Sequence, residues 1–161
     1  MNTIGHNLKL TVYGESHGKS IGAVLDGLPS GEYLDWDEVK KEMARRAPGK
    51  NTLSTSRKEG DVFDVQSGYF NDATTGTPLA VMIGNTNTRS EDYDELRHLM
   101  RPGHADYTSK VRYDGYNDYR GGGHFSGRLT APLVFAGAVA MQILGRRGIH
   151  VGSHILQIHD V

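Results

Sequence analysis

The sequence predicts an α+β fold in which antiparallel β-sheet layers pack on helices. Short stretches rich in β-branched and aromatic residues recur along the chain, and turns rich in Gly and Pro separate them, which is typical of strands. Two other segments repeat apolar residues at the helical period. The chain has 161 residues, about one domain, and hydrophobic residues make up 37% of them, which is enough for a buried core.

Five segments are predicted to be strands. The first, residues 8–13, alternates between apolar and polar side chains and ends at Gly14. The second covers residues 21–25, and Gly27 and Pro29 follow it. The remaining strands are residues 62–67, 79–84 and 149–158, with turn residues at 74–78 before the fourth strand.

The first predicted helix covers residues 36–46. Asp35 is placed to cap it, and Glu38 follows three residues later, as in a capping box. Pro48 and Gly49 are expected to end it. The side chains expected to face the core are Trp36, Val39 and Met43.

The second predicted helix, residues 128–147, has the clearest helical pattern. Its main apolar stripe consists of Leu129, Leu133, Ala136, Ala140 and Leu144. Further apolar side chains lie on its other faces, so we expect the helix to be buried on nearly all sides. One layer of strands covers only one side. The chain is therefore predicted to associate or to expose a large apolar patch.

Residues 85–125 form a long polar segment without a sustained apolar period. Loops of this length are uncommon in compact domains and are usually functional. Short helical pieces are predicted at residues 92–99 and 107–113. The segment therefore becomes the first place to look for a binding or catalytic site.

The composition excludes several classes of protein. A net charge of −1 argues against nucleic-acid binding, and the absence of cysteine excludes disulfides, thiolate zinc sites and a Cys nucleophile. No apolar run approaches the roughly 18 residues of a membrane helix, so no membrane partner is expected. The N-terminus does not resemble a signal peptide, and the cytoplasm is the predicted location.

Two sequence motifs near the N-terminus suggest chemistry that their context does not support. Residues 14–18 match the G-x-S-x-G elbow of serine hydrolases, but the glycines and β-branched residues after Ser16 do not favour the required helix. The Gly18-Lys19-Ser20 sequence lacks the upstream glycine of a P-loop. His150, His154 and His159 have no carboxylates at ligand spacing and are predicted to be surface or strand residues, so no metal site is predicted.

Two histidines are candidates for proton transfer. His17 and His104 each stand in a polar loop next to glycine. An imidazole on such a loop is expected to be exposed and to titrate near neutrality, which suits acid–base catalysis. Capping and surface roles are the alternatives for both residues.

Arginines are concentrated near the predicted helix ends and the long loop. Arg45 and Arg46 end the first helix, so their guanidinium groups could grip a phosphate or carboxylate, although a solvated helix face is the alternative. Arg101, Arg120 and Arg128 flank the long loop. Ser126 and the glycine amides at 121–123 are expected near the start of the second helix, a natural seat for an anion.

A series of motifs in a fixed order makes the chain resemble the chorismate synthases. The motifs are G-E-S-H-G at 14–18, R-R-A-P-G at 45–49, T-T-G-T-P at 74–78, R-P-G-H-A-D-Y at 101–107 and D-Y-R-G-G-G at 118–123, followed by Ser126 and Arg128. The resemblance covers essentially the whole chain. It implies the N-terminal part of that family's β-α-β sandwich fold.

The resemblance also implies an activity. The family converts 5-enolpyruvylshikimate 3-phosphate to chorismate by a 1,4-elimination of phosphate, a step of aromatic amino acid biosynthesis, and requires reduced FMN with NADPH as a possible reductant. It implies His17 as proton donor near the departing phosphate and His104 as the imidazole beside the reduced flavin. The residues implied to bind cofactor are Arg46, His124, Phe125 and Ser126, and those implied to bind substrate are Arg45, Arg101 and Arg128.

Family members are more than twice as long as this chain and assemble as tetramers. Their base, an Asp, and most of their FMN contacts lie in the C-terminal part. The chain, residues 1–161, is therefore expected to be an N-terminal fragment that is inactive alone. The alternatives are a non-catalytic module that binds an anion or the flavin phosphate, and a serine hydrolase acting through Ser16.

Overall fold

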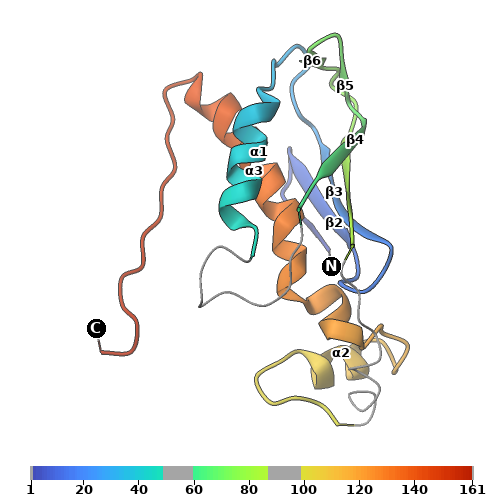
Figure 1. Cartoon of the computed structure of the whole chain (residues 1–161). Helices are drawn as coiled ribbons and strands as arrows, with labels where there is room; N and C mark the ends of the chain where they lie inside the picture. The colour runs from blue at the N-terminus through green and yellow to red at the C-terminus, as the bar shows by residue number, and fades with distance from the viewer. Residues whose placement is uncertain (1, 49–59, 87–98, 161) are drawn as a thin grey trace.

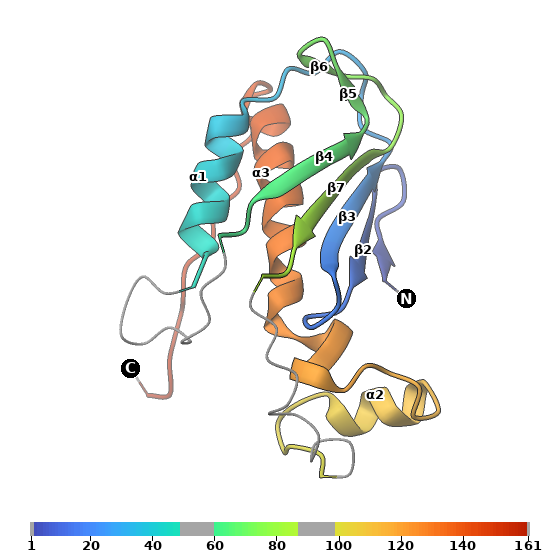
Figure 2. The same ribbon diagram turned by 45° about the vertical axis from the view of Figure 1, so that its right-hand side comes forward.

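A five-stranded antiparallel sheet and two long helices form the two layers of the fold (Figures 1 and 2). The computed structural model describes residues 2–48, 60–86 and 99–160. The sheet has the strand order β1 (Thr3–Ile4), β2 (Lys9–Gly14), β3 (Ser20–Asp26), β7 (Leu79–Gly84) and β4 (Phe63–Ser67). A two-stranded sheet, β5 (Tyr69–Phe70) and β6 (Ala73–Thr74), lies at one end. This architecture confirms the predicted α+β class.

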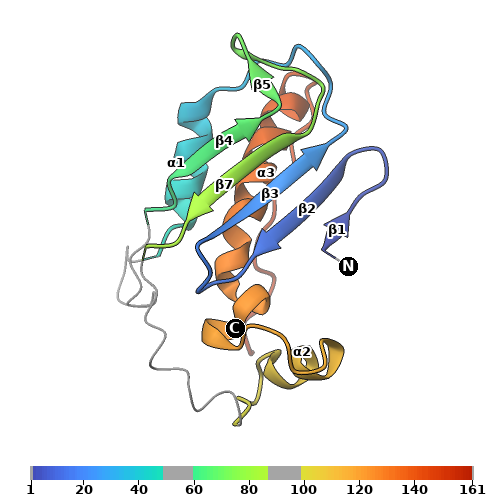
Figure 3. The same cartoon turned by 90° about the vertical axis from the view of Figure 1, so that its right-hand side faces the viewer.

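Side chains alternate across the central strands. The paired residues of β3 and β7 that face the helices are fully or almost fully buried: Ile21 opposite Ile83, Ala23 opposite Val81, and Leu25 opposite Leu79. The other face of the sheet has no described element against it (Figure 3). There the Tyr13 ring lies on Gly22, where a Cβ would come 2.3 Å from the Tyr13 hydroxyl oxygen. Four of the five predicted strands are confirmed; β7 has the predicted bounds, and the ends of the others differ by about one residue.

The first helix, α1 (Trp36–Arg46), has the predicted bounds. The Asp35 carboxylate accepts hydrogen bonds from the backbone N–H groups of Asp37, at 2.9 Å, and Glu38, at 3.3 Å. The Asp35 N–H donates to Gln142 Oε1 at 2.7 Å, so the cap is completed from the other helix. The predicted inward residues are confirmed, because Val39 and Met43 are buried and Trp36 packs against the core.

The second helix, α3 (Thr130–Gly145), begins later than predicted, because residues Gly127–Leu129 form a separate 3-10 turn, η3. Its buried residues are Ala131, Pro132, Phe135, Ala136, Ala138, Val139 and Ile143. The predicted stripe is therefore wrong in part, since Leu133 is 42% exposed. A helix that is apolar nearly all round carries no pattern that selects one face, and the position of the sheet and α1 decides it.

The predicted strand at residues 149–158 is wrong. This segment pairs with none of the described strands and extends away from the fold (Figure 1). Its apolar side chains are exposed, with Ile155 at 74% and Leu156 at 90%. An alternating pattern gives a segment the capacity to pair, but a strand forms only beside a partner edge.

The long polar segment contains one of its two predicted helical pieces, α2 (Asp106–Arg112). The other, residues 92–99, lies outside the described residues except for Leu99. In the part of the chain that the structure describes, one stretch, Arg120–Gly145, is long and apolar enough to cross a membrane. Half of its most apolar window is buried in the fold, as in the core helix of a soluble protein, so the stretch is weak evidence for a span.

Candidate functional site

Ser16 and His17 lie in the turn between β2 and β3, beneath the segment η2 (Arg120–Phe125). The Ser16 backbone N–H donates to Gly123 O at 3.0 Å, and its hydroxyl donates to Gly121 O at 3.2 Å. Ser16 is fully buried and His17 is 9% exposed. The predicted exposure of His17 is therefore wrong, because a segment more than 100 residues away in sequence covers the turn.

Gly121 makes this cover possible. Its φ is +57°, and a Cβ there would lie 2.2 Å from His17 Cε1 and 2.3 Å from His17 Nδ1. Gly122 and Gly123 also have positive φ, so the three-glycine turn adopts a backbone that other residues adopt only with strain. The three consecutive glycines are visible in the sequence, but we expected their amides to bind an anion. In the structure they cover the His17 ring instead.

The hydrogen bonds around His17 indicate which ring nitrogen carries the hydrogen of the neutral side chain. Ser16 Oγ lies 2.8 Å from His17 Nδ1. A hydroxyl carries one hydrogen, and the contact with Gly121 O favours an Oγ that donates there and accepts from Nδ1–H. In that tautomer the lone pair of the neutral ring is on Nε2. A protonated His17 can therefore release a proton from Nε2 without losing its bond to Ser16.

His104 lies in an exposed loop, as predicted, between Arg101 and α2. Its Nδ1 is 3.4 Å from Pro102 O. A Cβ on Gly122 would lie 3.8 Å from Arg101 Nη2, so this loop reaches the glycine turn that covers His17. The two candidate histidines are thus on segments that meet at one end of the molecule, one buried and one exposed.

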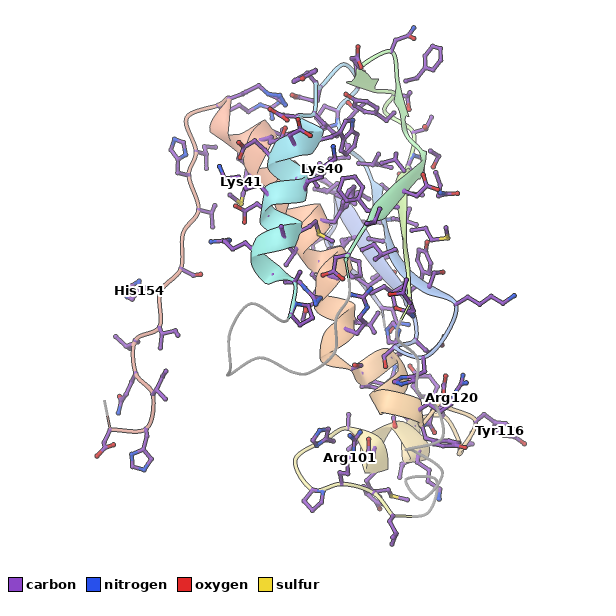
Figure 4. All side chains as sticks on the ribbon, in the orientation of Figure 1. Lys40, Lys41, Arg101, Tyr116, Arg120 and His154 are labelled. Atoms are coloured by element: carbon purple, nitrogen blue, oxygen red, sulfur yellow. The ribbon has the colours of Figure 1, made fainter. Side chains whose placement is uncertain are left out.

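Two of the arginines at this end form forked ion pairs with neighbouring carboxylates (Figure 4). Arg101 donates from Nε and Nη2 to Asp106 at 2.9 and 3.1 Å. These hydrogen bonds hold the pKa of Asp106 below its usual value. Arg120 binds Asp118 in the same way, at 2.8 and 2.7 Å. Burial acts to raise the pKa of Asp118, but the Arg120 hydrogen bonds outweigh it and leave the pKa lowered.

A third carboxylate, Asp61, joins two further arginines. Its side chain is fully buried, pairs with Arg128 Nη1, and lies 3.3 Å from Arg46 Nε. Arg128, itself buried, also donates from Nε to Asn85 Oδ1 at 3.1 Å. The cluster ties the end of α1 to the start of α3. Sequence reasoning did not identify Asp61, since no local pattern marks an acidic residue that meets cations from two distant helices.

Three further basic residues, Arg45 among them, lie on the surface of α1. Arg45 is 78% exposed in its side chain and pairs with Glu42 at 2.7 Å. Lys40 and Lys41 form exposed pairs with Asp37 and Glu38 on the same helix (Figure 4). These three residues match the solvated-face alternative. Lys50, Arg57 and Lys58 lie outside the described residues.

A groove of 440 Å³ opens beside the end of β2. Its lining is Asn2, Thr11, Val12, Tyr13, Gly14, Glu15, Tyr113, Tyr116, Asn117, Asp118, His124 and Phe125. His124 Nδ1 lies 2.8 Å from Gly14 O, and the Phe125 ring is 6.1 Å from that of Tyr113. Ser126 is not in this lining, because its hydroxyl caps η3 by accepting from the Arg128 N–H at 3.3 Å.

The groove suits the planar ring system of a flavin nucleotide better than its phosphate group. Its size is within the usual range of small-molecule sites, about 300–1,000 Å³. Aromatic side chains along it suit a planar ring system. Its charged lining residues, Glu15 and Asp118, are acidic, so the lining supplies no Lys or Arg for a phosphate.

Several known proteins with similar sequences belong to one family. The sequence model of the family described as Chorismate synthase matches residues 8–161. The chain is 48% identical over 161 residues to the chorismate synthase of Sulfurovum sp. (strain NBC37-1), covering 100% of this chain and 45% of that relative. It is 49% identical over 157 residues to that of Thermococcus gammatolerans, covering 98% of this chain and 44% of the relative.

A solved structure agrees. The structure titled Crystal Structure of Chorismate Synthase is similar with a TM-score of 0.61 and 28% identity, covering 89% of this chain and 36% of that one. The chain thus spans less than half the length of the relatives that it matches.

Proposed function

The chain belongs to the chorismate synthase family, corresponding to its N-terminal portion, and we propose that it carries that part of the active site which protonates and binds the phosphate of 5-enolpyruvylshikimate 3-phosphate. The proposed reaction is the 1,4-elimination of phosphate that gives chorismate. The observation that carries the proposal is the buried His17, held by Ser16 under Gly121. An imidazole fixed in one tautomer and shielded from water suits transfer of a single proton.

We propose His17 as the proton donor to the departing phosphate. Breaking a C–O bond to phosphate is easier when the developing negative charge is protonated or paired. The proposed donor atom is Nε2, since Nδ1 stays on Ser16 Oγ. His104, in its exposed loop, is the proposed proton carrier on the flavin side of the reaction.

The proposed substrate carries one phosphate and two carboxylates, and arginines are suited to bind them. We propose Arg101, Arg128 and Arg45 for this task, each of which already holds a carboxylate of the protein. A substrate anion must therefore compete with that carboxylate or bind at another edge of the guanidinium. Arg45 points to solvent beside Glu42, which makes it the weakest of the proposed anion ligands.

For the cofactor, we propose that His124 and Phe125 contact the flavin ring in the groove beside β2. Reduced FMN, when bound, supplies an electron-rich ring that lends charge to the allylic centre of the substrate. The acidic lining does not favour the FMN phosphate, so Ser126 and the half-buried Arg46 are the proposed contacts for phosphate groups of FMN or NADPH. Most of the remaining contacts are expected in the C-terminal portion of the enzyme.

We further propose that the full enzyme is a cytoplasmic homotetramer and that the 161 residues alone do not form chorismate. The exposed apolar side chains of α3 and of residues 149–158 support association. Light scattering should show oligomers, or a monomer that binds a hydrophobic dye. A monodisperse monomer without dye binding would contradict the association.

The proposal is tested by replacing His17 or His104 with Ala in the chain extended to the full length of its relatives. Turnover should fall at least about 10-fold, the low end for acid–base catalysis, while substrate and FMN affinity change much less. The exposed His154 provides a matched control (Figure 4), because it lies in the C-terminal segment away from the site. Near-normal turnover in either variant would remove that histidine from the mechanism.

A second candidate, a non-catalytic module that holds a planar ring, is favoured by the aromatic side chains that line the groove. Titrating the 161-residue chain with riboflavin and FMN distinguishes the two. Binding of both ligands without turnover after extension to full length would support the module.

A further inference from the structure

We propose that Asn85 is a positioning residue that holds the turn carrying Ser16 and His17. Asn85 follows the last residue of β7. Its side-chain Nδ2 donates to Glu15 O at 3.0 Å and to Gly18 O at 2.9 Å. Its backbone N–H donates to Lys19 O at 3.1 Å. One residue thus supplies three hydrogen bonds to the connection between β2 and β3.

The two accepting carbonyls stand at the corners of a tight turn. The Gly18 N–H donates to Glu15 O at 3.0 Å, which closes a four-residue turn with Ser16 and His17 as its central residues. The Asn85 amide therefore braces both ends of the turn from outside, while Gly121 and Gly123 bind Ser16 from the other side. His17 is fixed only when both sides are in place.

The orientation of the Asn85 amide is determined by its third contact. Arg128 Nε donates to Asn85 Oδ1 at 3.1 Å, and an arginine N–H can only donate. The oxygen must therefore face Arg128, and both amide hydrogens must face the turn. Asp61 in turn fixes Arg128 from within the core. A continuous path of charge-assisted and neutral hydrogen bonds thus joins Asp61 to the His17 turn.

The Asn85 amide accepts from Arg128 on one side and donates to the turn on the other. A single substitution can remove the second set of hydrogen bonds and keep the first. In Asn85→Asp, the carboxylate still accepts from Arg128, with added charge, but it cannot donate to Glu15 O or Gly18 O. The contact with the core is kept and the brace on the turn is lost. The effect on His17 can then be measured apart from the effect on folding.

The test uses the 161-residue chain and NMR of its imidazole nitrogens. Wild-type His17 is expected as the Nδ1–H tautomer, with slow exchange of the Gly18 N–H. In Asn85→Asp we expect a mixture of tautomers and at least about 10-fold faster exchange of that N–H. A tenfold change corresponds to the free energy of about one hydrogen bond. The thermal midpoint should fall by a few degrees for the two lost hydrogen bonds, while the chain stays folded because Arg128 keeps its partner.

Asn117→Asp is the matched control. Asn117 also donates from Nδ2, to Ser109 Oγ at 3.1 Å, and makes no hydrogen bond to residues 15–18 in the part of the chain that the structure describes. It should leave the His17 tautomer unchanged. An unchanged tautomer and unchanged Gly18 exchange in Asn85→Asp would overturn the proposal.

A measurement on the wild-type chain keeps the test decisive if the variant does not fold. Both Nδ2 hydrogens of Asn85 should exchange slowly with solvent, since both are bonded to carbonyls; rapid exchange of both would overturn the positioning role.

A last experiment depends on the proposed function. In the full-length enzyme, Asn85→Asp should lower kcat about 10-fold with little change in KM, the size of effect expected when an acid–base group is misplaced. Unchanged kcat together with an altered tautomer would refute the catalytic role of His17, not the positioning by Asn85.

Discussion

Where the sheet meets α1 and α3, buried apolar side chains make the contact, whereas the end that carries Ser16 and His17 is joined by hydrogen bonds and ion pairs. In the first region, Phe135 of α3 stacks on Trp36 at 6.3 Å and meets Phe63 edge-on at 5.1 Å. In the second, two carbonyls of a glycine turn receive Ser16. Apolar packing has no preferred direction, so it tolerates small shifts. Hydrogen bonds are directional and hold an imidazole in one place.

The largest expected effect lies in the apolar region. Phe135→Ala should lower the free energy of unfolding by about 3–5 kcal/mol, because it removes a fully buried ring that joins α1, α3 and the sheet. Urea denaturation measures this change. Leu133→Ala, on the exposed side of the same helix, is the control and should cost far less. Equal losses in the two variants would mean that α3 is covered on both sides in solution.

The next effect tests the charged cluster around Asp61. Arg46→Ala should weaken binding of inorganic phosphate by about 1.5–3 kcal/mol, the usual contribution of a charge-assisted hydrogen bond. Arg46→Lys should restore only part of it, since an ammonium cannot fork across two oxygens. Calorimetric titration measures both. Arg45→Ala is the adjacent control, and a loss as large as that of Arg46→Ala would point to a general positive field.

Gly121→Ala tests the hydrogen-bonded end that carries Ser16 and His17, and its effect on stability should be smaller than that of Phe135→Ala. A side chain at this positive φ costs about 1–2 kcal/mol, and its Cβ would collide with the His17 ring. We expect the NMR signals of His17 to shift while those of the core stay in place. Gly137→Ala, at an open helical position, should instead stabilise the chain by about 0.5–1 kcal/mol. Unshifted His17 signals in Gly121→Ala would show that the glycine turn does not position the ring.

The smallest effect concerns the forked pairs Arg101–Asp106 and Arg120–Asp118. Both carboxyl groups have lowered pKa values, so their contribution to stability is complete above the unfolded pKa of about 3.9. It is lost as the pH falls below that value through the lower folded pKa. Each contribution should stay below about 1 kcal/mol because solvent reaches both arginines and screens these half-buried pairs. Acid titration followed by NMR of the arginine Nε–H groups, with Asp106→Asn as control, measures it.

Local sequence rules account for most of the layered region. Asp35 before an acidic first turn predicts the start of α1, and the short apolar run at residues 79–84 after a turn predicts β7 with its observed bounds. These signals work because a cap and a pleated strand depend on neighbours within a few residues. Very short pairings such as β1 and β5–β6 escaped prediction, since two residues carry no periodicity.

In the candidate site, too, some features follow from the sequence and others only from the tertiary structure. The sequence by itself determined which residues could do chemistry: two histidines beside glycines, several arginines and a run of three glycines, in an order that identifies the family. Only the tertiary structure decided that His17 is buried, that Asp61 links Arg46 to Arg128, and that Asn85 braces the turn. It also decided which face of α3 meets the sheet and that residues 149–158 pair with no described strand. The physical reason is that these features depend on contacts between distant segments, several of them more than 100 residues apart, and such contacts leave no local periodicity in the chain.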